Sequence, residues 1–274
     1  MGKIPWLNLI LLFVTIISTT IAGAFQVSGT LTVDSFLMGF YFSVPLLLIL
    51  GIHELGHYFT AKNRGIKVSL PLFIPAPTMI GTFGAVIKME GIAKNRKSLL
   101  LVGAMGPISG FLIALPVMWI GLSMSKLVPL VGTEGIVLGD SLLVKLLVYL
   151  KFGKIPAGMD IYFSPVAFAG WIGFLVTALN LLPASQLDGG HIIYSLFPKL
   201  HGVITKIVIS VLFILGIFGW LGWIVWAVLV FLIGRKHPPT LFDNISLDNF
   251  SKTIALLSFL IFVLTFIPFP FKMN

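Results

Sequence analysis

The chain has 274 residues, of which 58% are hydrophobic and only 10% are charged. A soluble globular domain carries about 25% charged residues, so this composition excludes an ordinary water-soluble domain and indicates a surface that faces lipid. The 18 Lys and Arg against 9 Asp and Glu are scattered between apolar stretches, which argues against a nucleic-acid-binding surface. Because the chain has no cysteine, any metal ligand must be a nitrogen or an oxygen atom.

Apolar stretches long enough to cross a bilayer recur along the chain. A spanning helix needs about 20 mostly apolar residues. By this criterion we predict spans at residues 6–25, 40–61, 98–122, 163–183, 203–218, 219–234 and 252–268. The run 203–233 is too long for one ordinary span; its glycines permit a hairpin, and one long tilted helix is the alternative. We therefore expect an all-α polytopic membrane protein with about 6–7 transmembrane helices, forming a single membrane-embedded domain over 1–274 without an appended soluble domain.

Two long connections separate the predicted spans. In 63–97, Pro71, Pro75 and Pro77 break any helix, and residues 82–89 are typical of a short strand. This pattern predicts a small membrane-associated β-sheet or hairpin between the second and third spans. In 123–162, the apolar patch 142–150 is too short to span, so we expect a re-entrant or interfacial helix.

The basic residues predict an orientation. If Lys3 marks the cytoplasmic side, thirteen of the 18 Lys and Arg residues fall on that side. Cytoplasmic loops carry an excess of such residues. We therefore expect a multi-pass protein of the cell membrane, with its N-terminus inside and its C-terminus outside for an odd number of spans.

The second predicted span contains His53, Glu54 and His57 near its end. Helix positions i and i+4 share one face, so the two histidines can bind one metal ion, while Glu54 lies beside it as a general base for water. The same spacing also arises in ordinary helices. Inside an apolar span, however, two His and a Glu are costly unless they are paired, metal-bound or facing water. We therefore favour a metal site over a structural His pair.

A catalytic zinc usually has three protein ligands, so the two histidines need a partner. The best candidate is Asp188, which follows the end of the fourth predicted span at Pro183. We expect Gly189 and Gly190 to turn the backbone tightly after it. An Asp before Gly is also a common turn residue, which is the alternative role. The second and fourth spans run in the same direction, so this carboxylate and the histidines should lie at the same depth, near the cytoplasmic side.

Four further polar residues are candidates for a role in or near this site. His191 lies three residues beyond Asp188 and is a competing ligand, although a place beside the ligands or toward substrate is favoured. The Asn180 amide suits a developing oxyanion or substrate backbone, and an interhelical hydrogen bond explains it equally well. His201 and His237 fall in predicted connections, where we expect interfacial or solvated side chains.

The third predicted span carries small residues, among them Gly103, Gly106 and Gly110. Small residues let helices approach one another closely. Close helix packing near the metal site is enough to explain them.

In combination, these residues resemble the site-2 protease family of intramembrane zinc metalloproteases. The resemblance is carried by His53-Glu54-Leu55-Gly56-His57, by Asn180 to Pro183 with Leu187-Asp188-Gly189, and by Gly106-Pro107. Further similarity to the branch found in archaea, cyanobacteria and chloroplasts is carried by Gly81-Thr82-Phe83-Gly84-Ala85, by Arg235 to Pro239 and by Leu264-Thr265-Phe266-Ile267-Pro268.

The resemblance implies one Zn²⁺ per chain, held by His53, His57 and Asp188, with Glu54 as the base. It also implies regulated intramembrane proteolysis, in which membrane-spanning helices of single-span or multi-span proteins are cut within the lipid bilayer. A substrate helix must first unwind, and the predicted strand with Gly84 and Ala85 could pair with the opened segment.

Two other classes of function compete with this one. A transporter also builds polar sites from broken helices. A catalytically silent membrane-protein binder could keep zinc for structure alone. Glu54 argues against the silent binder, since a structural site needs no base and is normally closed by a fourth protein ligand.

Overall fold

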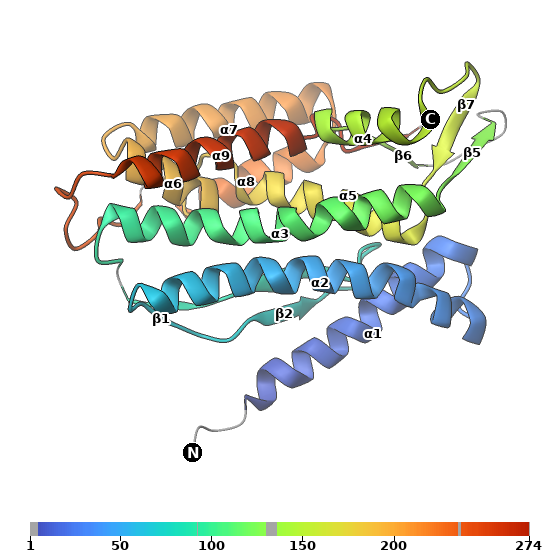
Figure 1. Ribbon diagram of the computed structural model, residues 1–274, viewed down its shortest axis with the longest axis horizontal. Coiled ribbons are helices and arrows are strands. Elements are labelled where there is room, and N and C mark those ends of the chain that lie inside the picture. Colours follow the sequence, from blue (N-terminus) through green and yellow to red (C-terminus); the bar gives the residue numbers. More distant parts are fainter. Residues whose placement is uncertain (1–4, 92, 130–135, 235–236, 274) are drawn as a thin grey trace.

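A computed structural model describes residues 5–91, 93–129, 136–234 and 237–273, and helices dominate this part of the chain (Figure 1). The helices are α1 (Trp6–Ser28), α2 (Val33–Asn63), α3 (Arg96–Met124), α4 (Leu142–Phe152), α5 (Pro165–Asn180), α6 (Asp188–Leu196), α7 (His201–Phe218), α8 (Gly222–Ile233) and α9 (Asn249–Thr265). The strands are β1 (Lys67–Val68), β2 (Leu72–Pro75), β3 (Thr82–Val86), β4 (Met89–Glu90), β5 (Lys126–Pro129), β6 (Ile136–Leu138), β7 (Met159–Tyr162) and β8 (Phe271–Met273). A helical fold with small sheets is therefore observed, as predicted.

Among the described residues, four helices are long and apolar enough to cross a membrane: α1, α2, α3 and α7. Helices α5, α8 and α9 are apolar but shorter, with at most 17 residues each. Large apolar side chains face outward, as at Phe218 on α7 and Leu232 on α8, which are 82% and 70% exposed. An apolar exterior of this extent indicates helices that contact lipid.

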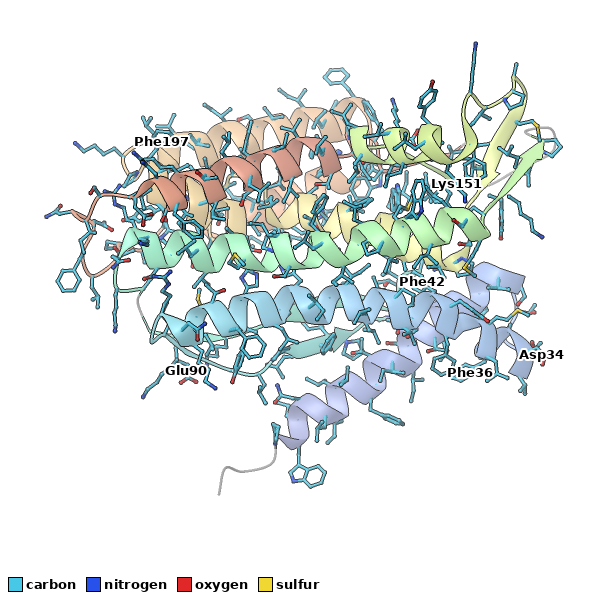
Figure 2. All side chains as sticks on the ribbon, viewed as in Figure 1. Asp34, Phe36, Phe42, Glu90, Lys151 and Phe197 are labelled. Atoms are coloured by element: carbon cyan, nitrogen blue, oxygen red, sulfur yellow. The ribbon has the colours of Figure 1, made fainter. Side chains whose placement is uncertain are left out.

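The charged side chains that Figure 2 labels lie away from the middle of the helical layer. Asp34 is at one end of α2, and Glu90 of β4 lies near the other end, whereas Phe42 between them is fully buried. Such a distribution keeps charge out of the apolar zone. Lys3, Arg235 and Lys236, which enter the predicted orientation, lie outside the described residues.

The long apolar run 203–233 is divided into two helices. Helix α7 ends at Phe218 and α8 begins at Gly222, and the two pack against each other. A Cβ added at Gly216 would lie 2.8 Å from the backbone nitrogen of Ile224, so the absence of a side chain allows this close packing. The alternative prediction of one continuous tilted helix over this run is therefore wrong.

The connection between α2 and α3 forms two short antiparallel ladders, β1 with β4 and β2 with β3. The strand predicted over 82–89 is thus interrupted at Ile87 and Lys88, where the chain passes from one ladder to the other. In 123–162, α4 covers the apolar patch, but the pairs β5–β7 and β6–β8 were not predicted. These strands have three or four residues each, too few for a recognisable sequence pattern.

Helix α2 is longer than predicted and begins at Val33, because the Thr32 and Ser35 side chains form a capping box. Its packing against α1 is close where Gly39 faces the backbone of Thr20, and the Thr19 and Ser43 hydroxyls are 2.6 Å apart. Beyond this crossing α1 diverges from α2 (Figure 1) and contacts β2.

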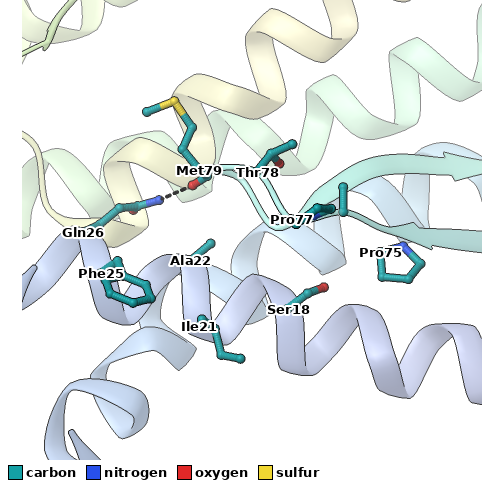
Figure 3. A pocket seen from close by; sticks show the side chains of 10 residues that line it. Ser18, Ile21, Ala22, Phe25, Gln26, Pro75, Pro77, Thr78 and Met79 are labelled. Carbon is teal, nitrogen blue, oxygen red and sulfur yellow. Dashed lines mark hydrogen bonds between the residues drawn. The ribbon is translucent and has the colours of Figure 1, made fainter. Parts of the chain in front are cut away.

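A cavity of about 750 Å³ lies between α1 and the turn that joins β2 to β3 (Figure 3). Phe25 and Gln26 line it from the helix and Pro77 and Met79 from the turn, with the Gln26 amide donating to the Met79 carbonyl at 3.2 Å. Among its lining residues there is no histidine or carboxylate. The predicted chemistry belongs to a different cavity, described next.

Candidate metal centre

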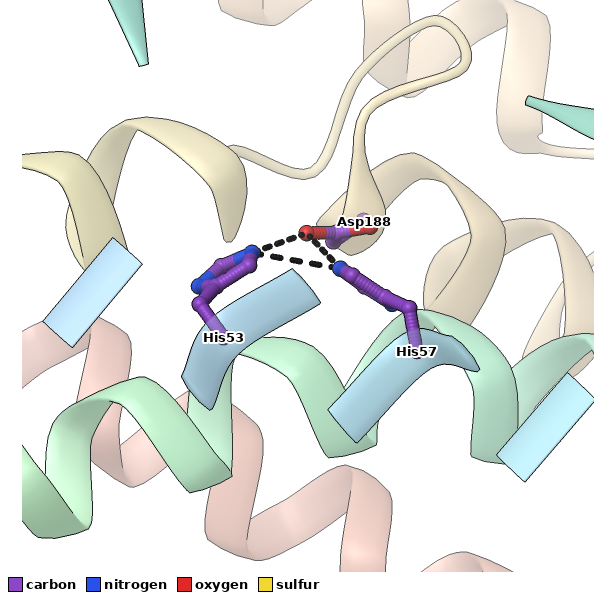
Figure 4. A group of neighbouring side chains, drawn as sticks. All are labelled: His53, His57 and Asp188. Atoms are coloured by element: carbon purple, nitrogen blue, oxygen red, sulfur yellow. Dashed lines mark hydrogen bonds and ion pairs between the residues drawn. The ribbon is translucent and has the colours of Figure 1, made fainter. Parts of the chain in front are cut away.

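His53 and His57 of α2 and Asp188 of α6 converge on one point (Figure 4). The two Nε2 atoms are 3.1 Å apart, and Asp188 Oδ2 lies 3.4 Å from that of His53 and 3.2 Å from that of His57. Both histidines are buried, at 3% and 6% exposure. The structure therefore brings together the three residues predicted as ligands.

The donor set and its spacing suit zinc. Zinc accepts imidazole nitrogen and carboxylate oxygen at about 2.0–2.1 Å in tetrahedral geometry, which places neighbouring ligand atoms about 3.3 Å apart. The three observed separations lie between 3.1 and 3.4 Å. Among the described residues these three form a group able to hold one ion. A tetrahedral ion would keep one position for water or substrate.

The ring of His57 is oriented by a backbone contact from α3. Its Nδ1 lies 2.8 Å from the Val102 carbonyl oxygen, which can only accept a hydrogen bond, so Nδ1 carries the proton. Nε2 is then unprotonated and free to bind a metal. Such a second hydrogen bond fixes both tautomer and direction of a metal-binding histidine.

Asp188 is the first residue of α6. The turn expected at Gly189 and Gly190 is wrong, because both residues are helical and neither has a positive φ. Their role is close packing: a Cβ at Gly189 would lie 2.1 Å from the Leu181 carbonyl oxygen, and one at Gly190 would lie 2.3 Å from that of Ser185. The glycines therefore let the start of α6, with its carboxylate, lie against the segment that follows α5.

Three glycines of α3 pack closely against the candidate metal centre, as their small-residue face predicted, although the sequence did not say which ligand each one meets. A Cβ at Gly106 would lie 2.0 Å from His57 Nε2, and one at Gly110 would lie 3.1 Å from His53 Nδ1. At Gly103 a Cβ would lie 2.9 Å from the Asp188 carbonyl oxygen. The spacing of three and four residues, which places all three on one face of α3, is the signal that could have revealed this contact.

Glu54 lines a cavity of about 450 Å³ together with the three candidate ligands. Ile87, just beyond β3, lines the same cavity with its backbone N–H toward the Glu54 carboxylate. Ala85 lines the same cavity, whereas Gly84 is not among its lining residues and adopts φ +101°. The strand segment thus borders the site, and its contact with Glu54 was not predicted.

Asn180 is the last residue of α5 and also lines this cavity. Its Nδ2 lies 3.3 Å from His53 Nε2, so the amide is close to a candidate ligand atom. This position suits contact with substrate at the metal. This contact also joins α5 to α2, so it is the interhelical hydrogen bond that the sequence offered as the alternative role.

The other histidines form a second cluster beside the site. His191 lines the same cavity, and its Nδ1 lies 2.6 Å from His237 Nε2. The expectation of an interfacial or solvated side chain is wrong for His201, whereas His237 is only partly buried. His201 is 2% exposed with its Nε2 3.0 Å from the Ser185 carbonyl oxygen, and burial lowers the pKa of His237. Both side chains pack against α6. For these two positions the sequence predicted only connections at the membrane surface.

Fold and site define a helical membrane protein with a candidate zinc centre between α2 and α6. Residues 41–219 match peptidase family M50, and because this is well over half of the chain, the protein belongs to that family. The matched region contains the three candidate ligands, Glu54 and Asn180.

Plant proteins are among the relatives. The chain is 36% identical to the probable zinc metalloprotease EGY2, chloroplastic, of Arabidopsis thaliana over 154 residues, which cover 56% of this chain and 28% of the relative. It is 32% identical to the protein of the same name from Oryza sativa subsp. indica over 181 residues, 64% of this chain and 32% of the relative. The chain is also 29% identical to the probable zinc metalloprotease EGY1, chloroplastic, of Arabidopsis thaliana over 230 residues, which cover 81% of this chain and 42% of the relative. The chain spans less than half the length of these relatives.

Proposed function

We propose that this protein is a zinc-dependent endopeptidase that cleaves peptide bonds of membrane-spanning substrates, as in site-2 proteases. The observation that carries the proposal is the placement of Glu54 in one cavity with His53, His57 and Asp188. Family membership and the names of the plant relatives support it. We place the site in a cell membrane near the cytoplasmic side, on the distribution of basic residues.

Zinc, when bound by the three ligands, would supply an acidic water and a Lewis acid for the scissile carbonyl. Glu54 adjoins His53 in sequence and lines the same cavity, where the Ile87 backbone N–H faces its carboxylate, and we assign this carboxylate as the general base. The base takes a proton from water and returns it to the leaving amine. Asn180, at 3.3 Å from a ligand nitrogen, is placed to donate its amide to the developing oxyanion.

The substrate must present an extended segment to this cavity, because a helix hides its backbone hydrogen-bonding groups. Strand β3 pairs with β2 on one edge, and within the described residues no strand pairs with its other edge. A free edge of this kind accepts a peptide as an added strand. Ala85 to Met89 border the cavity, so a substrate paired there would pass beside Glu54.

The test compares purified wild-type protein with Glu54→Gln in liposomes that contain a single-span substrate. We expect equal zinc content in both proteins, with cleavage by the wild type alone. Gln keeps the size of the side chain and removes the base. Zinc in both proteins with cleavage by neither, across substrates of different sequence, would contradict the proposal and favour a silent binder.

A further inference from the structure

A chain of contacts leads from the loop after α8 to the candidate metal centre. His237 lies in this loop, with its Nδ1 2.6 Å from the Pro238 carbonyl oxygen and its Nε2 2.6 Å from His191 Nδ1. His191 lies on α6, one turn after Asp188, and lines the cavity of the candidate ligands. The proposed mechanism uses neither imidazole.

The direction of these hydrogen bonds follows from their acceptors. A carbonyl oxygen only accepts, so His237 carries its proton on Nδ1. In the neutral imidazole its Nε2 is then an acceptor, and His191 must donate from Nδ1. Nε2 of His191 is left with a lone pair. The carbonyl of Pro238 thus determines, through two rings, the tautomer of the histidine at the cavity.

The His237 ring is held in place by its other neighbours. Tyr194, one turn after His191 on α6, stacks on it with centroids 4.4 Å apart and an interplanar angle of 23°. The Tyr194 hydroxyl donates to Asp243 Oδ2 at 2.7 Å, which ties the same loop to α6. Tyr194 therefore holds the His237 ring in position for its hydrogen bond to His191.

We propose that His237 is a positioning residue that holds His191 in the Nδ1–H tautomer, so that His191 Nε2 accepts a hydrogen bond from a backbone N–H of the substrate. Within the described residues, this Nε2 has no hydrogen-bonding partner of its own. An unwound substrate brings unpaired N–H groups into an apolar surrounding, where each needs an acceptor. A protonated Nε2 would instead be a donor and could not fill this role. The substrate part of the inference rests on the proposed function.

The first readout is the tautomer itself. We would label the histidines with ¹⁵N, record the ring nitrogens of the zinc-loaded protein in lipid bilayers, and assign His191 by its loss in His191→Gln. The expected spectrum shows a protonated Nδ1 and an unprotonated Nε2.

Two variants of His237 separate the roles of its ring and its acceptor nitrogen. His237→Gln places an amide oxygen near the original Nε2 and should preserve the His191 tautomer. His237→Phe keeps the ring and removes the acceptor, so both His191 tautomers should appear. Tyr149→Phe, an exposed change on α4, is the control and should leave the spectrum unchanged.

The second readout is the kinetics of cleavage. Loss of one substrate hydrogen bond should raise KM about 10-fold in His237→Phe with little change in kcat, and His237→Gln should restore the wild-type value. A His191 protonated at Nε2 in the wild type, or a His237→Phe protein with unchanged tautomer and KM, overturns the inference. The spectra need no turnover, so absent cleavage with the expected tautomer contradicts the proposed function while supporting the positioning role of His237.

Discussion

Gly106 of α3 lies directly against the imidazole of His57 on α2. A Cβ atom built at Gly106 would be 2.0 Å from Nε2, the atom expected to bind zinc, and 2.3 Å from Cε1. The Val102 carbonyl, one turn earlier on α3, fixes the other side of the same ring. Helix α3 therefore determines both the tautomer of this ligand and the space in which its ring lies.

Gly106→Ala should displace the His57 ring and weaken zinc binding by about 10- to 100-fold, the range typical of changes that reorient a ligand. Titration with a competing chelator measures this affinity. Gly51→Ala on α2 is the control, since its Cβ would meet only Phe73 Cζ at 3.6 Å, an ordinary contact. Equal zinc affinity in the two variants would show that the site tolerates movement of the ring.

Asn180→Leu should lower kcat by about 100-fold while zinc content stays at the wild-type level, because an oxyanion donor acts in the transition state. Single-turnover cleavage and metal analysis give the two quantities. The control is Thr177→Val, which removes a buried hydroxyl that donates to Gly173 within α5, at 2.8 Å, one turn before Asn180. If Asn180→Leu instead lowers the unfolding temperature and leaves kcat unchanged, the amide serves packing alone.

Proline substitutions in β3 test whether its free edge binds substrate. Neighbouring N–H groups of a strand point to opposite edges, so one of Ala85→Pro and Val86→Pro removes a donor from the outer edge and the other removes a donor to β2. The variant that loses the outer-edge donor should raise KM with fold and zinc intact. The variant that loses the donor to β2 should destabilise the sheet. Gly84 is unsuitable, since its φ of +101° is closed to proline. Cleavage at the wild-type rate in both variants would exclude strand addition at β3.

The Tyr194–Asp243 contact should make stability depend on pH. Burial alone would raise the pKa of Asp243, but hydrogen bonds from Thr240 and Tyr194 lower it below the ordinary 3.8. A lowered pKa means that the contribution to stability is present above about pH 4 and is lost as the pH falls through the folded value. Asp243→Asn should therefore lower the unfolding temperature at neutral pH, and the difference from wild type should shrink in acid. The control is Glu90→Gln, which changes an exposed side chain. A difference in unfolding temperature between Asp243→Asn and wild type that stays the same at every pH would contradict the assignment.

Much of the fold was predictable because it depends on local composition. Apolar stretches of about 20 residues predict helices, and helices occur at all seven predicted positions. The start of α2 at Val33 was missed, since its first turn is polar and depends on the Thr32 cap. The pairing of β6 with β8 joins segments near opposite ends of the second half of the chain. Such short strands are stabilised by partners that the sequence does not specify.

The sequence by itself determined that His53 and His57 face the same side of α2 with Glu54 beside them, because helical periodicity alone places the two histidines on one face. It also made Asp188 the best partner, by chain direction across a membrane. Only the tertiary structure decided which candidate ligand each glycine of α3 contacts, that Ile87 contacts Glu54, and that His237 reaches His191. The physical reason is that these contacts join segments far apart in the chain, and their distances are set by how the helices pack together.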